Sequence, residues 1–367
     1  MSITKIAVTG GPCAGKTTAL SRIQRDFSHL GYTVLIVPET ATLLISGGVA
    51  PWTCGTREDF QKNQMYLQMQ KELVFQRAAS TMPSDKILIV CDRGALDSKA
   101  YMTEDEFLHT LDYLGTTEME IRDGYDAVFH LVSAAKGAEE YYSLENNAAR
   151  YETLEEATAL DDRILAAWTG HPHLRVIGNA TDFEGKMRGL IHEIAYFLGE
   201  VTPFEIERKY LVTYPDVAWL ESLPNCEKVH IAQTYLRSDP DDEIRIRQRG
   251  SGNQSLYYFT EKRIVDGRNQ LRTQRRLTPG EYQMLLMQAD PNRRKITKTR
   301  YCLTFQEQYF EIDLYPCWDD QAIVEIELSS EDQEVVFPPE LRVIREVTGD
   351  PTYRNAVIAS KPKGATH

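Results

Sequence analysis

The chain has 367 residues, of which 42% are hydrophobic and 26% charged, and its 54 Asp and Glu against 41 Lys and Arg give a net charge of −13. This length and composition suit about two globular domains, and the negative charge argues against a general nucleic-acid-binding protein. No apolar run approaches the ~20 residues of a membrane-spanning helix, and six scattered cysteines without a C-x-x-C pair favour a reduced compartment without structural zinc. We therefore expect a cytoplasmic protein, with peripheral contact at membranes left open.

A glycine-rich stretch near the N-terminus carries the first motif. Residues 10–17 read GGPCAGKT and match the phosphate-binding pattern G-x-x-x-x-G-K-[ST], between an apolar strand predicted over 5–9 and a helix predicted over 18–30. In that setting backbone N–H groups face a phosphate at the helix N-terminus, a lysine contacts the β/γ-phosphates and a threonine hydroxyl contacts Mg²⁺. The predicted nucleotide-binding residues are Gly10, Gly11, Ala14, Gly15, Lys16, Thr17 and Thr18, with Thr17 also a metal ligand.

Two acids follow the next predicted strands. Glu39 comes just after the strand at 32–37, and Asp92 ends the apolar run that begins at residue 86. The carboxyl ends of parallel strands border the ligand crevice. We interpret Asp92 as the metal contact of a phosphoryl-transfer site. Glu39 either holds metal-bound water, or acts as a base toward a phosphoryl acceptor, or caps a helix.

Helices and strands alternate through the rest of this half, which predicts an α/β domain with a doubly wound parallel sheet. Residues 57–77 predict a long polar helix with Phe60, Leu67, Leu73 and Val74 facing inward. The polar segment 136–152 lies where nucleotide kinases place a mobile lid. Its Arg150, or Arg163 in the following helix, either reaches the transferring phosphate or lies on the solvated surface. The remaining predicted elements are strands at 127–132 and 174–177 and helices at 155–168 and 183–198.

These segments also carry a resemblance. The phosphate loop, VPETAT, CDRGALDSKAY and WTGHPHLRVI resemble the P-loop domain of the TRPL-translocation-defect protein family, which is related to NadR-like nicotinamide-riboside kinases, across nearly all of residues 3–198. The resemblance implies GTP or ATP binding, with NTPase or kinase chemistry. It also brings phosphatidic acid binding and vesicle trafficking as an alternative. The absence of an N-K-x-D motif favours ATP, whereas the resemblance favours GTP.

The second half is organised by charged residues at alternating positions of six predicted strands. Alternate residues of a strand share one face, so each strand presents a charged row. A solvated face explains one such row, but six favour a closed barrel whose interior holds ion pairs, a charged ligand and metal. Cations suit a polyphosphate, and carboxylates suit Mg²⁺ or Mn²⁺. The rows are Glu205, Glu207 and Lys209; Arg245, Arg247 and Arg249; Tyr258, Thr260 and Lys262; Lys298 and Arg300; Glu311 and Asp313; Glu325 and Glu327.

The pattern resembles the CYTH, or triphosphate tunnel metalloenzyme, superfamily. EIERK at 205–209 matches its E-x-E-x-K signature, and EIRIRQRG, FEIDLY, IVEIEL and VTGDPTYRN extend the match over residues 204–359. The resemblance implies an α+β domain with an antiparallel eight-stranded tunnel barrel. The implied catalytic residues are Glu205, Glu207 and Lys209, alongside Glu39 and Asp92 of the first half. The implied metal ligands are Glu205, Glu207, Asp313, Glu325 and Glu327, and the phosphate-binding residues are Arg245, Arg247, Lys262, Lys298 and Arg300.

Together these observations predict a P-loop domain at 1–200, a tunnel domain at 201–360 and a flexible tail at 361–367. The predicted function is ATP or GTP binding coupled to metal-dependent hydrolysis of tripolyphosphate, or of a nucleoside or organic triphosphate, with Mg²⁺ or Mn²⁺ as cofactor and no nucleic-acid partner. Two alternatives stay open. One is a nucleotide-switched module that binds an anionic phospholipid, and the other is a small-molecule kinase.

Overall fold

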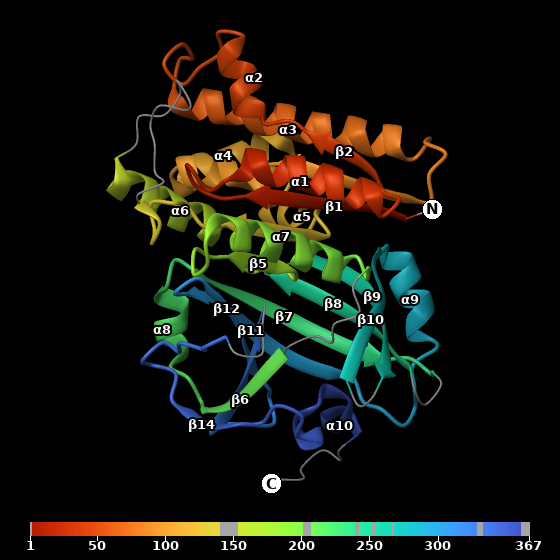
Figure 1. Cartoon of the computed structure of the whole chain (residues 1–367). Coiled ribbons are helices and arrows are strands. Elements are labelled where there is room, and N and C mark those ends of the chain that lie inside the picture. Colours follow the sequence, from red (N-terminus) through yellow and green to blue (C-terminus); the bar gives the residue numbers. More distant parts are fainter. Residues whose placement is uncertain are drawn as a thin grey trace. The chain divides into compact units, whose positions relative to one another are not determined.

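The computed structural model describes residues 2–139, 153–200, 207–238, 242–251, 254–265, 268–328 and 333–360. The chain divides into two compact units, Met1–Ile194 and Ala195–His367 (Figure 1), here called unit 1 and unit 2. Arg150, Glu205 and the tail at 361–367 lie outside the described residues, so the predictions made for them stay predictions. No helix among the described residues is long and apolar enough to cross a membrane.

Unit 1 contains the predicted parallel α/β sheet. Its five strands lie in the order β2-β3-β1-β4-β5 and all pair in parallel, with helices on both faces of the sheet (Figure 1). β1 lies in the centre and the chain continues outward on both sides of it, which brings the carboxyl ends of β1 and β3 together. The strands are β1 (Ser2–Thr9), β2 (Thr33–Val37), β3 (Lys86–Asp92), β4 (Ala127–Leu131) and β5 (Leu174–Ile177).

Four helices of unit 1 begin after a threonine that caps the first turn. Thr56, Thr103, Thr117 and Thr153 each accept a hydrogen bond from a backbone N–H of the first turn, and a glutamate three residues later completes a capping box after the last three. The elements are α1 (Lys16–His29), α2 (Thr40–Ser46), α3 (Arg57–Ala79), the 3₁₀ helix η1 (Ala95–Tyr101), α4 (Glu104–Leu114), α5 (Glu118–Arg122), α6 (Leu154–Trp168) and α7 (Phe183–Phe197).

The buried face of α3 differs from the prediction. Leu73 is 37% exposed and Val74 is 60% exposed, so the expectation that they face inward is wrong. The helix instead buries a polar row, made of Gln61, Gln64, Gln68 and Glu72. A single-sequence pattern assigns apolar residues to the core, and it does not reveal that polar groups such as Lys5 Nζ of β1 and the carbonyl oxygen of Arg93 face this helix.

Unit 2 is built on one antiparallel sheet of nine strands in the order β10-β9-β8-β7-β11-β12-β13-β6-β14. Over the described residues β10 and β14 end this order, so strand pairing does not close the predicted eight-stranded barrel. The strands are β6 (Glu207–Thr213), β7 (Cys226–Tyr235), β8 (Asp242–Ser251), β9 (Gln254–Val265), β10 (Arg268–Leu277), β11 (Ile296–Phe305), β12 (Gln308–Leu314), β13 (Gln321–Glu327) and β14 (Val343–Glu346). The helices are α8 (Val217–Ser222), α9 (Pro279–Leu286), the 3₁₀ helix η3 (Pro351–Tyr353) and α10 (Asn355–Ser360).

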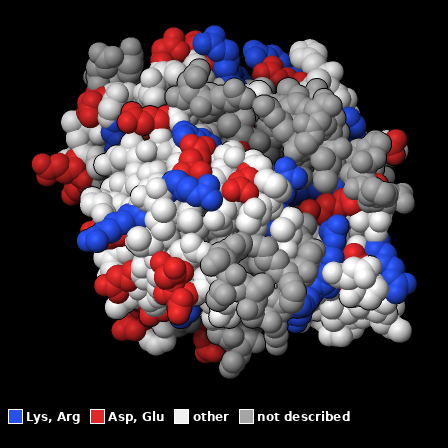
Figure 2. Space-filling model, turned by 90° about the horizontal axis from the view of Figure 1, so that it is seen from below, with Lys and Arg blue, Asp and Glu red and all other residues white. Residues whose placement is uncertain are grey.

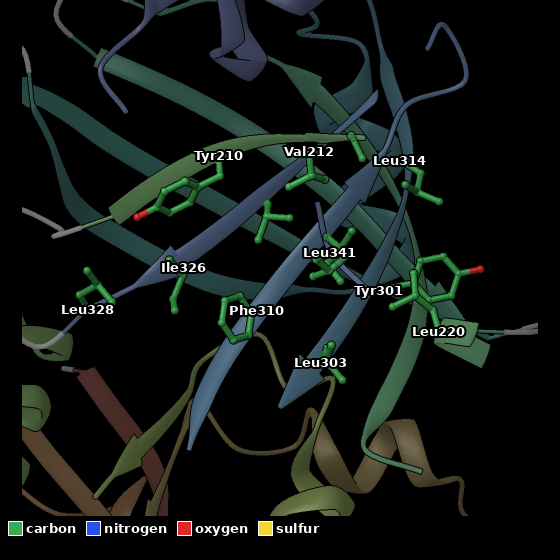
Figure 3. Close-up of a cluster of buried hydrophobic side chains, with 13 residues drawn as sticks. Tyr210, Val212, Leu220, Tyr301, Leu303, Phe310, Leu314, Ile326, Leu328 and Leu341 are labelled. Carbon is green, nitrogen blue, oxygen red and sulfur yellow. The ribbon is translucent and has the colours of Figure 1, made fainter. Parts of the chain in front are cut away.

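An apolar cluster covers one face of this sheet (Figure 3). Alternate residues of four neighbouring strands supply it, together with Leu220 of α8, Leu328 and Leu341. Burying one such large side chain stabilises the fold by roughly 1.5–3 kcal/mol, so the cluster fixes which face of each strand is covered. The opposite face then carries the intervening residues, and a slip of one residue in register would exchange the two faces. The strand residues of the cluster are Tyr210, Val212, Tyr301, Leu303, Phe310, Ile312, Leu314, Ala322, Val324 and Ile326.

Candidate functional site

The phosphate-binding loop of unit 1 joins β1 to α1, and glycines shape it. Gly10 has φ +138°, and a Cβ there would lie 2.1 Å from the carbonyl oxygen of Leu131. Gly15, at the N-cap of α1, is left-handed with φ 91°, and no side chain caps the helix. The first N–H groups of a helix without a side-chain cap attract anions. The loop therefore has the backbone that the motif predicts, and Thr17 and Thr18 lie exposed at its end.

Lys16 folds back over this loop. Its Nζ donates hydrogen bonds of 2.8 Å to the carbonyl oxygens of both Gly10 and Gly11. Burial, and then the nearby Arg93 guanidinium, lower the pKa of Lys16 to about 7, although three carboxylates partly offset them. A phosphate group at the loop would favour the charged amine, because an opposite charge stabilises a buried cation.

Arg93 ties together the acids at the carboxyl edge of the sheet. It follows β3 with a positive φ of 67°, and its Nε donates to Glu39 Oε1 at 2.7 Å. One terminal nitrogen lies 3.2 Å from Asp97 Oδ2 and 3.2 Å from the Gly10 carbonyl oxygen. Burial opposes ionisation of Glu39, but Arg93, a hydrogen bond from Thr42 and Lys16 outweigh it and lower the pKa of Glu39 to about 2.

Glu39 and Asp92 thus lie at one site with Lys16, as the sequence predicts for strand ends. Glu39 occupies the N-cap position of α2, yet its side chain caps no backbone N–H and pairs with Arg93 instead. Burial, and then the Glu39 carboxylate, raise the pKa of Asp92. Arg163, the second arginine considered for the transferring phosphate, donates a hydrogen bond of 2.9 Å from its Nε to the carbonyl oxygen of Ala100.

Two buried acids that the sequence analysis missed hold the loop from either side. Asp97 accepts hydrogen bonds of 2.6 Å from Thr9 Oγ1 and 2.6 Å from Trp168 Nε1. Asp161 accepts one of 2.7 Å from the backbone N–H of Gly11, and its other oxygen lies 2.9 Å from Lys136 Nζ. A signal for Asp161 existed, since it sits on the apolar face of α6 beside Leu160, Ile164 and Leu165.

In unit 2 the strand registers place the predicted charged rows on one face. Glu325 lies opposite Lys209, Asp313 opposite Arg300, and Arg247 opposite Tyr258. Directly opposite residues of an antiparallel pair share a face. We call this side, opposite the apolar cluster, the charged face. Its members are Glu207, Lys209, Arg245, Arg247, Arg249, Tyr258, Thr260, Lys262, Lys298, Arg300, Glu311, Asp313, Glu325 and Glu327.

One part of the charged face is neutralised by its own ion pairs. Lys209 Nζ lies 2.6 Å from Glu325 Oε1 and 3.3 Å from Glu207 Oε1. Arg300 bridges Asp313 at 2.6 Å and Glu325 at 2.7 Å. Burial opposes the charge on Glu325, but Lys209, Lys298 and Arg300 outweigh it and hold the pKa of Glu325 well below its usual range. Lys298 and Arg300 also pair with Asp313 and Glu311, respectively.

The neighbouring part, on β8 and β9, carries hydrogen-bond donors without acceptors. The Nε of Arg247 and the Oγ1 of Thr260 are buried and make no hydrogen bond to any described residue. Burial, and then the cations Arg245, Arg249 and Arg300, lower the pKa of Arg247 to about 10, so it stays cationic at neutral pH. Its contact is the Tyr258 ring, whose centroid lies 5.6 Å from the guanidinium. This combination suits an anion that supplies oxygen acceptors.

The carboxylates of the charged face fit a divalent cation by donor type. Glu207 and Glu327 lie opposite each other on β6 and β13, next to Glu325, and carboxylate oxygens are the ligands that Mg²⁺ and Mn²⁺ take. Among the described residues, however, no three His, Cys, Asp or Glu side chains group closely enough to hold a metal ion. Glu205, the other acid of the signature, lies outside them.

The outer surface carries charges of both signs. On the face seen in Figure 2, Lys and Arg side chains lie among Asp and Glu side chains. Arg293, in the basic stretch at 293–295, lies 3.5 Å from Asp290 and stacks over the Tyr235 ring at 5.0 Å. This arginine is therefore already engaged within unit 2.

Comparison with known proteins gives two kinds of match. The family model described as an AAA domain matches residues 5–186, which lie in unit 1. The inorganic triphosphatase of Nitrosomonas europaea is 32% identical over 159 residues, which are 42% of this chain and 96% of that protein. The inorganic triphosphatase of Acetivibrio thermocellus is 27% identical over 161 residues, 43% of this chain and 94% of that protein.

Among solved structures, the crystal structure of an inorganic triphosphatase is 30% identical and covers 44% of this chain and 99% of its own, with a TM-score of 0.32. The identity to the Nitrosomonas protein extends over nearly that whole protein. Similarity of that extent reflects common descent of the entire domain, not a shared motif. This chain therefore belongs, over about two fifths of its length, to the family of the inorganic triphosphatases.

Proposed function

We propose that unit 2 binds inorganic triphosphate on the charged face and hydrolyses it with a divalent metal ion, while the phosphate-binding loop of unit 1 binds ATP or GTP. The names of the two curated relatives support the substrate of unit 2. The AAA domain match supports nucleotide binding in unit 1. The proposal includes a curled sheet that encloses the substrate as a tunnel.

The observation that carries the unit 2 proposal is the pair of donors at Arg247 and Thr260. Both are buried without an acceptor among the described residues, and a buried polar group without a partner costs about 1–3 kcal/mol. The Arg247 cation also lies among three other arginines. A linear polyphosphate supplies both the oxygen acceptors and the negative charge, whereas a neutral ligand supplies only the first.

In this proposal, different side chains of the charged face bind phosphate and metal. Arg245, Arg247 and Lys262 donate to phosphate oxygens and stabilise the charge that develops there during hydrolysis. Lys209 and Arg300 hold the carboxylate of Glu325 in a fixed orientation. Glu207 and Glu327, which lie opposite each other on β6 and β13, are the proposed metal ligands together with Glu205, which is taken from the sequence. A bound Mg²⁺ or Mn²⁺ would neutralise phosphate oxygens and make water a better nucleophile.

Phosphate release from tripolyphosphate tests the unit 2 proposal. We expect activity with Mg²⁺ or Mn²⁺ and a loss of about 10- to 1000-fold in kcat/KM for Arg247→Gln, as for other donors to developing charge. Arg342→Gln is the matched control, because Arg342 is exposed outside the charged face. Lys16→Ala should keep this activity. Wild-type protein that releases no phosphate with either metal, or full activity of Arg247→Gln, would overturn the proposal.

Direct binding tests the nucleotide site of unit 1. Titration calorimetry with ATP and with GTP should give saturable binding that Lys16→Ala weakens at least tenfold, since a charge-assisted hydrogen bond contributes about 1.5–3 kcal/mol. Lys62→Ala serves as a control on a partly exposed helix surface, where Lys62 pairs with Glu58. Absence of binding by both nucleotides would refute this half of the proposal and leave the unit 2 half standing.

A further inference from the structure

Asp161 of α6 places a fully buried carboxylate against the phosphate-binding loop. Its Oδ1 accepts hydrogen bonds from the backbone N–H of Gly11 at 2.7 Å and from that of Ser133 at 3.2 Å. The hydroxyl of Ser133 in turn donates to the carbonyl oxygen of Pro12 at 2.5 Å. Two successive residues of the loop are thus tied, directly and through Ser133, to one acid.

An acid is an unexpected neighbour for a loop that binds anions, because like charges repel each other. Two basic side chains compensate it. Lys136 Nζ lies 2.9 Å from Oδ2, and Nε2 of the buried His130 lies 3.2 Å from Oδ1. Burial opposes ionisation of Asp161, but His130 and Lys136 outweigh it and hold the pKa of Asp161 well below its usual range. At neutral pH the group is therefore a carboxylate, and its hydrogen bonds to the loop are charge-assisted.

The glycine at position 11 is explained by this carboxylate. The motif G-x-x-x-x-G-K-[ST] specifies Gly10 and Gly15 but leaves position 11 open. Gly11 is not among the residues with positive φ, so its backbone conformation does not demand glycine. A Cβ at Gly11 would instead lie 2.7 Å from Oδ1 and 2.8 Å from Cβ of Asp161. The loop thus has no side chain at the place where it rests on the acid.

The helix that carries Asp161 is firmly anchored. Thr153 and Glu156 form a capping box at the start of α6. On the same face as Asp161, Ile164 and Trp168 are both 0% exposed. A side chain whose helix is capped and packed in this way has its position set by the fold. The acceptor for the Gly11 N–H is therefore in place without a ligand.

We propose that Asp161 is a positioning residue of the nucleotide site, which fixes the Gly11 peptide and so holds the phosphate-binding loop in its anion-binding form before the nucleotide arrives. The proposal rests on the nucleotide site proposed above for unit 1. A loop that is ordered in advance loses less conformational freedom on binding, and this raises the affinity for the ligand.

Lys16 makes the other contact to Gly11, by donating to its carbonyl oxygen at 2.8 Å. In loops of this kind the lysine contacts the β/γ-phosphates, so this hydrogen bond is given up when the nucleotide binds. The bond from the Gly11 N–H to Asp161 does not compete with a phosphate in that way. Asp161 is then the contact that keeps the first half of the loop in place in both states.

Titration calorimetry of the full chain with ATP tests the proposal. Asp161→Ala should raise the Kd about 10- to 100-fold, the effect of losing a hydrogen bond to a charged group. Asp161→Asn keeps an oxygen acceptor for the two N–H groups and should recover most of that loss. Asp162→Ala is the matched control, because Asp162 pairs with the same Lys136 at 2.6 Å but is 64% exposed, and it should bind ATP as wild type does.

A second pair of variants separates positioning from a general loss of stability. Gly11→Ala should raise the Kd for ATP about tenfold or more, because its Cβ meets Asp161. In an Asp161→Gly background, which removes both the carboxylate and the Cβ, the same substitution should raise the Kd by less than about threefold, as a double-mutant cycle between contacting residues reveals. Urea denaturation without ATP measures the free energy of unfolding of each variant, so affinities are compared between folded proteins.

The outcomes distinguish this inference from the proposed function. Wild-type affinity in folded Asp161→Ala, or an equal effect of Gly11→Ala in both backgrounds, overturns the inference and leaves the nucleotide site standing. If Asp161→Ala and Asp161→Gly do not fold, Gly11→Ala decides, because it keeps every partner of Asp161, and an unaltered Kd overturns the inference. If wild type binds neither ATP nor GTP, the nucleotide site and this inference fall together, while tripolyphosphate hydrolysis by the same preparations tests unit 2 separately.

Discussion

The substitution Arg247→Met tests whether the Arg247 side chain serves ligand binding or the stability of the fold. The pKa of Arg247 is lowered to about 10 in the folded protein, and each unit of such a shift corresponds to about 1.4 kcal/mol. The shift therefore amounts to roughly 3 kcal/mol against the charged form, of which we expect 1–2 kcal/mol after solvent screening. Because the folded pKa is the lower one, this cost is complete below about pH 10 and fades as the pH rises toward the unfolded value.

At neutral pH, then, Arg247→Met should raise the free energy of unfolding of the ligand-free protein by about 1–2 kcal/mol, since methionine fills similar space without the charge. Tripolyphosphate, added in EDTA so that no metal takes part, should stabilise wild type by about 2.7 kcal/mol at one hundred times its Kd. The variant should lose most of that gain.

Urea denaturation with and without tripolyphosphate measures both effects, and Arg342→Met, at an exposed arginine, controls for loss of one positive charge. A ligand-free variant less stable than wild type by more than about 1 kcal/mol would show that Arg247 has a structural partner, given the usual size of mutational effects. Equal stabilisation of both proteins by tripolyphosphate would place the ligand elsewhere.

Three further predictions follow from the same physics. Glu325→Gln leaves Lys209 and Arg300 without a shared carboxylate and should lower the free energy of unfolding by about 3–5 kcal/mol. The control Glu340→Gln, at an exposed position, should leave it unchanged. A loss below about 1 kcal/mol for Glu325→Gln would contradict the prediction. Because the pKa of Lys16 is about 7, ATP binding should take up about one proton at about pH 8.5 and almost none at about pH 6. Calorimetry in HEPES and in Tris measures this proton uptake. Equal uptake at the two pH values would refute the lowered pKa. Gln61→Leu should raise the ligand-free free energy of unfolding by about 1–3 kcal/mol, because it removes a buried amide whose Oε1 makes no hydrogen bond to any described residue, and a destabilised variant would reveal a hidden partner.

The two-residue spacing of charged side chains explains which features of unit 2 could be predicted from the sequence. Charged residues at every second position identify a shared face regardless of how the strands pair, so the charged face follows from the rows around Arg247 and Glu325. The order of nine strands does not, because pairing between strands far apart in sequence depends on packing that no local pattern records. Which cation meets which acid, such as Arg300 with Asp313, required the register.

In unit 1 the loop and strand ends were predictable because motif and strand order coincide there. Asp97, Asp161 and the amides of α3 were missed for one reason. A polar residue in a helix is read as solvated unless something reveals that the surface it faces is also polar. The partners of Gln68 are Thr40 and Arg93, which follow β2 and β3, and these approach α3 only in the folded unit.

The ion pair between Lys209 and Glu325 also has a consequence for synthesis of the chain. The two residues are separated by 116 positions, so β6 leaves the ribosome long before β13, its partner in the sheet. At translation rates of about 5–20 residues per second that wait is roughly 6–23 seconds. The sheet of unit 1 is complete at Ile177 and can form during this interval. Nascent chains released before β13 would expose β6 without the carboxylate of Glu325, so unit 2 can form its complete sheet only after its last strands have been made.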